Sequence, residues 1–311
     1  MEKKSLKIVF MGTSDFAVDS MEAIANSEHN LQAVVTLKDR KAGRGQKMIP
    51  TAVKKSALNL ETELIEIDSP KEDYLEQKLK ELQPDLIVVI AFRILPDSIL
   101  NIPKYGCVNL HASLLPKYRG PAPINWAIIN GDTKTGNTIF FLDSGVDTGK
   151  ILYTSECEIT ENMTTGELYE KLEKQGPSLV LKALDSISTN SYELIQQDES
   201  VACKAPKLFK DDAKIDFSKD AKVVHNQIRG MNPFPGSHSF FRDKLIKIIS
   251  SEVSQTNGEI GKIIDIQKDG IFIGCKIGSV KIIKVAPQGK NPMDIASFIN
   301  GYKPLINEII G

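Results

Sequence analysis

Five short apolar runs, separated by amphipathic stretches, constrain the first half of this chain more than any other feature. The runs are rich in Val, Ile and Leu, and they cover residues 8–11, 33–37, 64–67, 86–90 and 108–110. Short apolar runs of this kind predict buried strands, and strands that alternate with helices are typical of a parallel sheet covered on both faces. The sequence therefore predicts an α/β domain with a doubly wound, mostly parallel sheet.

Capping residues mark two helix starts in this half. The pattern Ser-Pro-Lys-Glu at 69–72 combines an N-cap, a proline at the first helical position and a reciprocal glutamate, and predicts a helix from there to about Leu82. The pattern Thr-Thr-Gly-Glu at 164–167 is a similar capping box. It predicts a long helix that runs toward residue 187.

The pattern changes after a polar stretch without periodicity at residues 188–209. Short alternating segments follow at residues 246–252, 261–266, 271–275 and 280–285, separated by Asn-Gly, Asp-Gly and Gly-Ser turns. They predict antiparallel strands in a small five- or six-stranded barrel, and the proline after Asn291 predicts the start of a short helix. We therefore expect a domain of residues 1–189, a linker of residues 190–208 and a second domain of residues 209–311.

Charge is distributed unevenly between the two halves, although the net charge is only -1. Residues 1–202 carry 22 basic and 29 acidic side chains, whereas residues 203–311 carry 17 and 11. A basic second half beside an acidic first half fits a module that faces nucleic acid, but a solvated surface would look the same.

Cysteines and the start of the chain indicate the compartment. The four cysteines are scattered without Cys-x-x-Cys spacing, which argues against a disulfide framework and against a zinc site. The start of the chain has a run of only four apolar residues before Gly12, too short for a signal peptide, and there is no 18-residue apolar run. We expect a soluble, cytoplasmic protein that does not bind a membrane.

An amide, an imidazole and a carboxylate on two loops form the candidate catalytic set. Asn109 and His111 are two residues apart at the end of a predicted strand, so both side chains leave on the same face. A carboxylate from the later Asp-Ser-Gly-Val-Asp-Thr-Gly segment could orient the imidazole, and the residues alone do not decide between Asp143 and Asp147. Such a set can stabilise an oxyanion and move a proton during attack on an acyl carbon.

These residues, continued by Ser-Leu-Leu-Pro at 113–116 and Arg-Gly at 119–120, closely resemble the formyl-tetrahydrofolate-dependent formyltransferases. The segments at 11–17, 38–50 and 205–208 resemble the branch that formylates methionyl-tRNA, and the match runs nearly end to end. The resemblance implies a Rossmann-like catalytic domain followed by an OB-like β-barrel domain that binds tRNA. It also implies transfer of a formyl group from 10-formyltetrahydrofolate to methionyl-initiator tRNA, by a monomer in translation initiation.

The resemblance also assigns roles to residues. It implies that Asn109, His111 and Asp147 are catalytic, because the family's carboxylate occupies the Asp-Thr-Gly position. It implies that two loops hold the pterin ring of the folate co-substrate. Their residues are Ser113, Leu114, Leu115, Pro116, Ile90, Phe92 and Leu95.

A basic loop favours RNA binding. Residues 38–47 hold five basic groups and one acid, and glycines beside Arg44 allow the loop to reach into a groove. The resemblance implies contact with the tRNA acceptor arm, and the residues that we predict to bind RNA are Arg40, Lys41, Arg44, Lys47 and Lys207. In the second half, Lys204, Lys210, Arg229 and Lys290 are equally plausible contacts.

Other functions fit the sequence less well. There is no Gly-x-Gly-x-x-Gly after the first strand and no Walker A motif, and the four histidines lack paired ligand spacing, so we expect no dinucleotide and no metal. A formyltransferase for a nucleotide-linked amino sugar would share the catalytic set but would not need the basic loop. An inactive RNA-binding relative would have lost that set.

Overall fold

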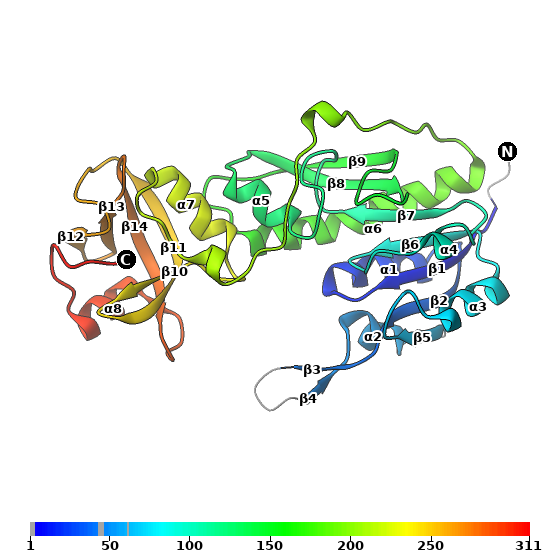
Figure 1. Ribbon diagram of the computed structural model, residues 1–311, viewed down its shortest axis with the longest axis horizontal. Coiled ribbons are helices and arrows are strands. Elements are labelled where there is room, and N and C mark those ends of the chain that lie inside the picture. The colour runs from blue at the N-terminus through cyan, green and yellow to red at the C-terminus, as the bar shows by residue number, and fades with distance from the viewer. Residues whose placement is uncertain (1–3, 43–46, 61) are drawn as a thin grey trace. The chain divides into compact units, whose positions relative to one another are not determined.

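The computed structural model describes residues 4–42, 47–60 and 62–311, and the chain divides into two compact units (Figure 1). The first unit consists of the chain up to Gly120 together with Gly136–Cys157 and Tyr169–Lys204. The second unit consists of Pro121–Thr135, Glu158–Leu168 and Ala205–Gly311. Each unit therefore combines segments that are distant in the sequence.

A seven-stranded sheet with the strand order β5-β2-β1-β6-β7-β8-β9 forms the centre of the first unit. Strands β5, β2, β1, β6 and β7 pair in parallel, and β8 is antiparallel to β7. The predicted Rossmann-like, mostly parallel sheet is confirmed. The strands are β1 (Lys7–Gly12), β2 (Asn30–Leu37), β5 (Glu63–Ile67), β6 (Leu86–Ile90), β7 (Cys107–His111), β8 (Lys134–Phe141) and β9 (Ile151–Glu158).

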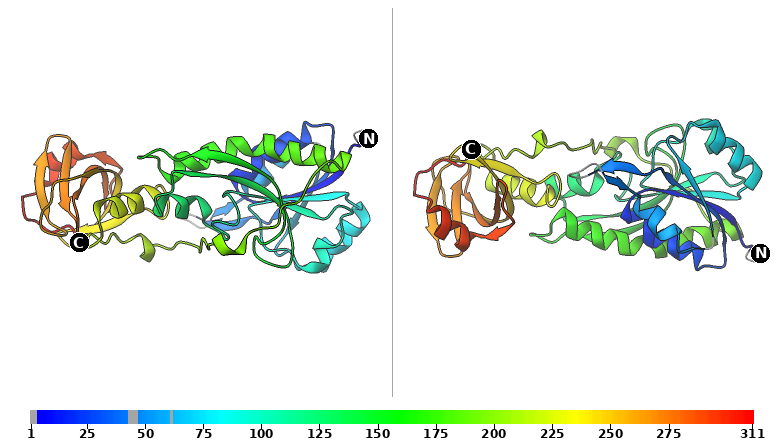
Figure 2. Two further views of the ribbon diagram at one scale, coloured as in Figure 1. Left: turned by 90° about the horizontal axis from the view of Figure 1, so that it is seen from above. Right: turned by 90° about the horizontal axis from the view of Figure 1, so that it is seen from below.

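Helices cover both faces of this sheet because its central strands are apolar on both sides. Val9 and Met11 of β1 pack with α3 (Asp73–Leu82) and α4 (Asp97–Leu100) in one core cluster. Alternate residues of β1 point to the opposite face, where α1 (Val18–Ala25) and α6 (Thr165–Thr189) lie (Figure 2). The unit also contains the 3-10 turns η1 (Asp15–Ala17) and η2 (Glu199–Val201), and helix α2 (Ala52–Ala57).

The two predicted helix starts have different outcomes. The box at 164–167 is confirmed, since the Thr164 N–H donates to Glu167 Oε2 at 2.8 Å and α6 begins at Thr165. Helix α3 ends at Leu82 as predicted but begins at Asp73 instead of Pro70. Glu72 accepts from the Ser69 N–H at 2.7 Å as in a capping box, but the Ser69 hydroxyl accepts from the Lys71 N–H at 3.3 Å instead of from Glu72. These bonds therefore stabilise a turn that precedes the helix. Within the described ranges, no helix is long and apolar enough to cross a membrane.

An antiparallel sheet with the order β10-β11-β14-β13-β12 forms the second unit, and β15 pairs with β14. The four strands predicted in this region are confirmed, whereas β10 was not predicted. The strands are β10 (His238–Phe241), β11 (Lys244–Ser254), β12 (Ile263–Gln267), β13 (Gly270–Gly274), β14 (Ser279–Pro287) and β15 (Met293–Asp294). The end of the chain bridges both edges of the sheet, since Ile310 pairs with Phe241 and Ile309 with Lys262.

Helices pack on this sheet around an apolar core. Phe298 of α8 (Ile295–Tyr302) is buried and meets Phe241 edge-to-face at 5.5 Å. The start predicted for α8 at Asn291 is wrong, because residues 293–294 pair with β14 and Asp294 then caps the helix through the Ser297 N–H at 2.7 Å. The other helical segments are α5 (Pro123–Ile129), η3 (Asp211–Ala213) and α7 (Ala221–Gly230).

Candidate active site

Strand β7 presents Asn109 and His111 at its carboxyl end. In the antiparallel pair with β8, Asn109 lies opposite Phe140 and His111 lies opposite Thr138. The Asn109 side chain is half-buried, and it makes no hydrogen bond to any described residue. Its amide is therefore available to a ligand, while His111 is only 8% exposed.

Two protein groups contact the imidazole of His111. Its Nε2 lies 2.8 Å from the carbonyl oxygen of Tyr118, and its Nδ1 lies 3.8 Å from Oδ2 of Asp147. Because a carbonyl oxygen can only accept, the Tyr118 contact assigns a proton to Nε2. Nδ1 is thus the ring nitrogen that faces the carboxylate.

Asp147 lies in the loop between β8 and β9, which is held close to the sheet. Its backbone is left-handed, with φ +55°, and its Oδ2 accepts from the Gly120 N–H at 2.8 Å. Gly149 ends the loop so close to β8 that a Cβ there would lie 1.7 Å from the Phe141 oxygen. Only glycine allows that approach.

Asp143, the other candidate carboxylate, is exposed and satisfies groups of its own loop. Its Oδ1 accepts from the Gly145 N–H at 2.9 Å and from the Thr148 hydroxyl at 2.6 Å. This is the geometry of a turn-forming aspartate. Within the described residues, Asp147 and not Asp143 forms the ion pair with His111.

The segment Tyr118–Gly120 supplies two of these contacts, and sequence reasoning did not assign it a role in the site. Its backbone is left-handed at Tyr118 (φ +63°), and a hydrogen bond of 2.9 Å from the Arg119 N–H to the Cys203 oxygen holds it. The Arg119 guanidinium binds Gln197 and Glu199, and the hydrogen bond to Glu199 is the main reason why the pKa of Arg119 is raised. The contact through Tyr118 is made by the backbone, which side-chain patterns do not reveal.

The residues predicted to hold folate form two neighbouring groups at the same edge of the sheet. Ile90 is the last residue of β6, and the others follow β6 or β7, which are adjacent and parallel. Ser113 is fully buried, and its hydroxyl donates to the Lys117 oxygen at 2.6 Å. Ile90, Leu95 and Leu115 are buried, whereas Leu114, Pro116 and Phe92 are half-buried.

The residues predicted to bind RNA lie apart from one another along the chain. Arg40 and Lys41 belong to β3 (Arg40–Ala42), and Lys47 begins β4 (Lys47–Ile49), with which β3 forms an antiparallel ribbon where the sequence indicated a loop. All three side chains are exposed, Arg44 lies outside the described residues, and Lys207 is exposed, 5.4 Å above the Phe209 ring.

Arg229 is not a surface contact, contrary to the expectation from the sequence. It is 4% exposed, and its guanidinium donates to Asn226 Oδ1 and to the Met163 oxygen, both at 3.0 Å. Burial lowers its pKa. Its role is to hold α7 in the second unit.

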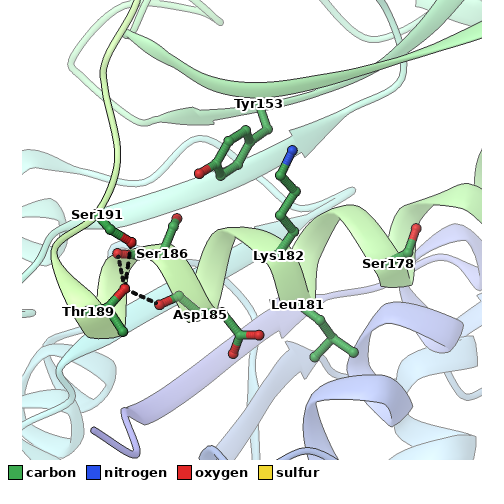
Figure 3. A pocket seen from close by; sticks show the side chains of 8 residues that line it. All are labelled: Tyr153, Ser178, Leu181, Lys182, Asp185, Ser186, Thr189 and Ser191. Atoms are coloured by element: carbon green, nitrogen blue, oxygen red, sulfur yellow. Dashed lines mark hydrogen bonds between the residues drawn. The ribbon is translucent and has the colours of Figure 1, made fainter. Parts of the chain in front are cut away.

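A separate hollow lies over the C-terminal half of α6 and contains none of the predicted site residues (Figure 3). Hydroxyl groups line most of it, and the ammonium of Lys182 lies 4.2 Å above the ring of Tyr153. Within residues 4–42, 47–60 and 62–311, no group of three His, Cys, Asp or Glu side chains could hold a metal ion.

Family models and curated relatives cover almost the whole chain. Residues 6–184 match the formyl transferase family, and residues 207–303 match the formyl transferase C-terminal domain. A methionyl-tRNA formyltransferase of Clostridium novyi (strain NT) is 42% identical over 309 residues, which cover 98% of this chain and 100% of that protein. That of Clostridium beijerinckii is 44% identical over 303 residues, which cover 96% of this chain and 97% of that protein.

Solved structures share the fold at lower identity. An N-formyltransferase from Helicobacter canadensis, in complex with folinic acid and dTDP-3-aminofucose, superposes with a TM-score of 0.69 at 24% identity, over 89% of this chain and 98% of that one. A sugar 3N-formyl transferase superposes with a TM-score of 0.67 at 22% identity, over 93% of this chain and 100% of that one. These two likenesses concern the fold only.

Proposed function

This chain belongs to the methionyl-tRNA formyltransferase branch of the formyl transferase family, and on that premise we propose that it transfers the formyl group of 10-formyltetrahydrofolate to the α-amino group of methionyl-initiator tRNA. The observation that carries the mechanism is the arrangement at the end of β7. There an unpaired amide stands beside an imidazole that faces a carboxylate at 3.8 Å.

The transfer is direct. The lone pair of the deprotonated α-amine attacks the formyl carbon, the new C–N bond forms, and the carbonyl oxygen becomes an oxyanion in a tetrahedral intermediate. Collapse of this intermediate breaks the bond between the formyl carbon and N10, and the proton lost by the amine goes to N10. No protein nucleophile is required, and the residues need only stabilise charge and move one proton.

Asn109 and His111 perform these two tasks. The Asn109 amide donates a hydrogen bond to the oxyanion. The Nε2–H of His111 is anchored to the Tyr118 oxygen, so Nδ1 accepts the proton from the amine and delivers it to N10. While the proton is on Nδ1, the Asp147 carboxylate stabilises the positive charge of the ring.

The two loops after β6 and β7 fit a folate co-substrate. Parallel neighbouring strands end at one edge, so the loops can cover a flat ring from two sides. The half-buried side chains of Phe92 and Leu114 offer apolar contacts, and the peptide groups of these loops offer polar ones. The buried Ser113, Leu115 and Ile90 hold the loops in shape, and Thr138 fixes the second loop by accepting from the Leu115 N–H at 3.1 Å.

Two basic surfaces are proposed to bind the tRNA. The first is the ribbon of β3 and β4, where Arg40, Lys41 and Lys47 form no ion pair with a described residue. The second is a groove of about 500 Å³ in the second unit, whose charged lining consists of Lys247, Lys284 and Lys290. None of the three lysines is paired with an acid in the described chain, so the groove attracts phosphate groups. Lys207 adds a further positive charge.

Formylation of two acceptors by the purified protein tests the proposed function. We expect the protein to formylate methionyl-tRNA with 10-formyltetrahydrofolate and to leave a nucleotide-linked amino sugar unchanged. The opposite preference would favour the sugar formyltransferases, and RNA binding without formylation of either acceptor would indicate an inactive relative. We also propose that the protein acts as a cytoplasmic monomer. The molar mass from light scattering of the purified protein checks that it is a monomer.

Salt dependence tests the RNA surface. The double variant Lys284→Ala/Lys290→Ala should weaken tRNA binding and reduce the steepness of log affinity against log salt by about 1.4 to 1.8, since each lost phosphate contact removes roughly 0.7 to 0.9. The control Lys268→Ala/Lys276→Ala removes the same charge outside the groove and should leave the slope unchanged. Equal effects of the two double variants would refute the proposal that the groove binds tRNA.

A further inference from the structure

One residue of the polar stretch between the two predicted domains differs from its neighbours in burial. From Asn190 to Lys204, all of which the structure describes, Gln197 is the one residue that is buried, with 4% of its surface exposed. A buried amide must be hydrogen-bonded, because leaving it unpaired costs about 1–3 kcal/mol. The partners of Gln197 therefore explain why this stretch is held against the first unit.

The amide of Gln197 uses its full hydrogen-bonding capacity. Its Nε2 donates to the backbone oxygens of Asp147 at 2.9 Å and of Gly149 at 2.7 Å. Its Oε1 accepts from Nε of Arg119 at 3.0 Å and from Nη2 at 2.7 Å. An amide has two N–H donors and two oxygen lone pairs, and all four are used. Two carbonyl oxygens on one side and a guanidinium on the other also fix which end of the amide is nitrogen.

These bonds join the two segments that contact His111 and Asp147. One segment contains Asp147, and the other contains Tyr118, which accepts from His111, and Gly120, which donates to the Asp147 carboxylate. Besides the bond from Gly120, a second link between the segments passes from the backbone of Asp147 and Gly149 through Gln197 to Arg119. Asp147 also has a left-handed backbone, which aspartate tolerates but adopts less readily than glycine, so external bonds help to hold it there.

We infer that Gln197 is a positioning residue that holds the Asp147 loop in register with His111. The inference rests on the proposed function, because it assigns Gln197 an effect on the same transfer reaction. Gln197 touches no reacting atom and acts through the backbone of Asp147. A shift of about 1 Å in a catalytic group can cost on the order of 100-fold in rate, so the loss of these bonds should be visible in kcat.

Gln197→Glu is the sharpest variant. The two side chains have the same shape, but a carboxylate cannot donate, and it would face the carbonyl oxygens of Asp147 and Gly149 while keeping its contact with Arg119. We expect kcat to fall by about 10- to 100-fold while KM for methionyl-tRNA changes less than about threefold. Gln196→Glu introduces the same charge at the adjacent exposed residue, and it should leave kcat unchanged.

A double-mutant cycle with Asp147→Asn separates positioning from a general structural role. If Gln197 acts through the Asp147 carboxylate, Gln197→Glu should lower kcat much less in the Asp147→Asn background than in the parent protein. Equal losses in both backgrounds would overturn the inference. A parent protein that does not formylate methionyl-tRNA would instead refute the proposed function.

A second variant keeps the inference testable if Gln197→Glu does not fold. Arg119→Lys removes the planar pair of donors from Oε1 of Gln197 and leaves the bonds to Asp147 and Gly149 in place. We expect a smaller loss of kcat that is again suppressed by Asp147→Asn. A loss of kcat that persists in the Asp147→Asn background would show that Arg119 and Gln197 do not act through this loop.

Discussion

Replacement of Asp147 by Asn tests the proposed proton transfer most directly. Asn has the same shape, tolerates the left-handed backbone at this position, and can still accept from the Gly120 N–H through Oδ1. The change therefore removes the negative charge 3.8 Å from Nδ1 of His111 and leaves the backbone as it is.

The distance sets the size of the effect. Two unit charges 3.8 Å apart attract each other by about 4 kcal/mol at an effective dielectric constant of about 20. The side chains of His111 and Asp147 are 9% and 18% exposed, so water weakens this attraction only in part. If the ring is charged in the transition state, kcat should fall by about 30- to 1,000-fold.

Single-turnover formylation of methionyl-tRNA at saturating co-substrate measures this loss, and the thermal midpoint shows whether the variant is folded. Asp143→Asn is the matched control, because it removes a carboxylate from the same loop whose hydrogen bonds, among the described residues, go to Gly145 and Thr148. We expect the control to retain kcat within about threefold. A folded Asp147→Asn variant with the kcat of the parent, or equal losses in the two variants, would refute the assignment.

Three further predictions follow from single side chains. Asn109→Ala should lower kcat at least about tenfold with little change in KM, since one oxyanion donor is typically worth about 100- to 1,000-fold, and near-normal turnover of the folded variant would contradict that role. Burial lowers the pKa of His225 from its ordinary 6.5, so protonation favours the unfolded chain and the free energy of unfolding should decrease as pH falls below about 6.5. The thermal midpoint should therefore drop between about pH 7 and about pH 5, and it should drop less in His225→Gln. Burial raises the pKa of Cys107 to about 12 and that of Cys275 to about 11. A thiol reagent at about pH 8 should therefore label the exposed Cys203 first. Rapid labelling of more than one thiol per folded chain would be inconsistent with this burial.

Strands that are buried on both faces were the easiest to predict from the sequence. The apolar run at 86–90 coincides with β6, because a strand covered by helices on both sides needs apolar residues at every position. Strand β8 was not predicted, since it contains Thr135, Asn137 and Thr138, all of them buried. The Asn137 amide donates to the Leu172 oxygen at 2.8 Å, and a bond over 35 residues leaves no local pattern.

The sequence also placed the two catalytic candidates of β7 correctly relative to each other. Side chains two residues apart in a strand share a face, so Asn109 and His111 needed no tertiary information. Asp143 and Asp147 are both good turn formers, and local patterns do not distinguish them. Hydrogen bonds from Gly120 and Gln197 orient the loop so that Asp147 is the one beside His111.

By itself, then, the sequence determined the parallel sheet, the antiparallel second unit and the pair on β7, because each depends on periodicity or on residues close together in the chain. Only the tertiary structure decided which carboxylate faces the imidazole, that the Tyr118 carbonyl binds it, and that Gln197 connects the two loops. Those contacts join segments up to 78 residues apart, so each of them depends on where the fold places both segments. Tyr118, Asp147 and Gly149 take part through backbone oxygens, which nearly every sequence would supply, so these contacts leave no mark in the order of side chains.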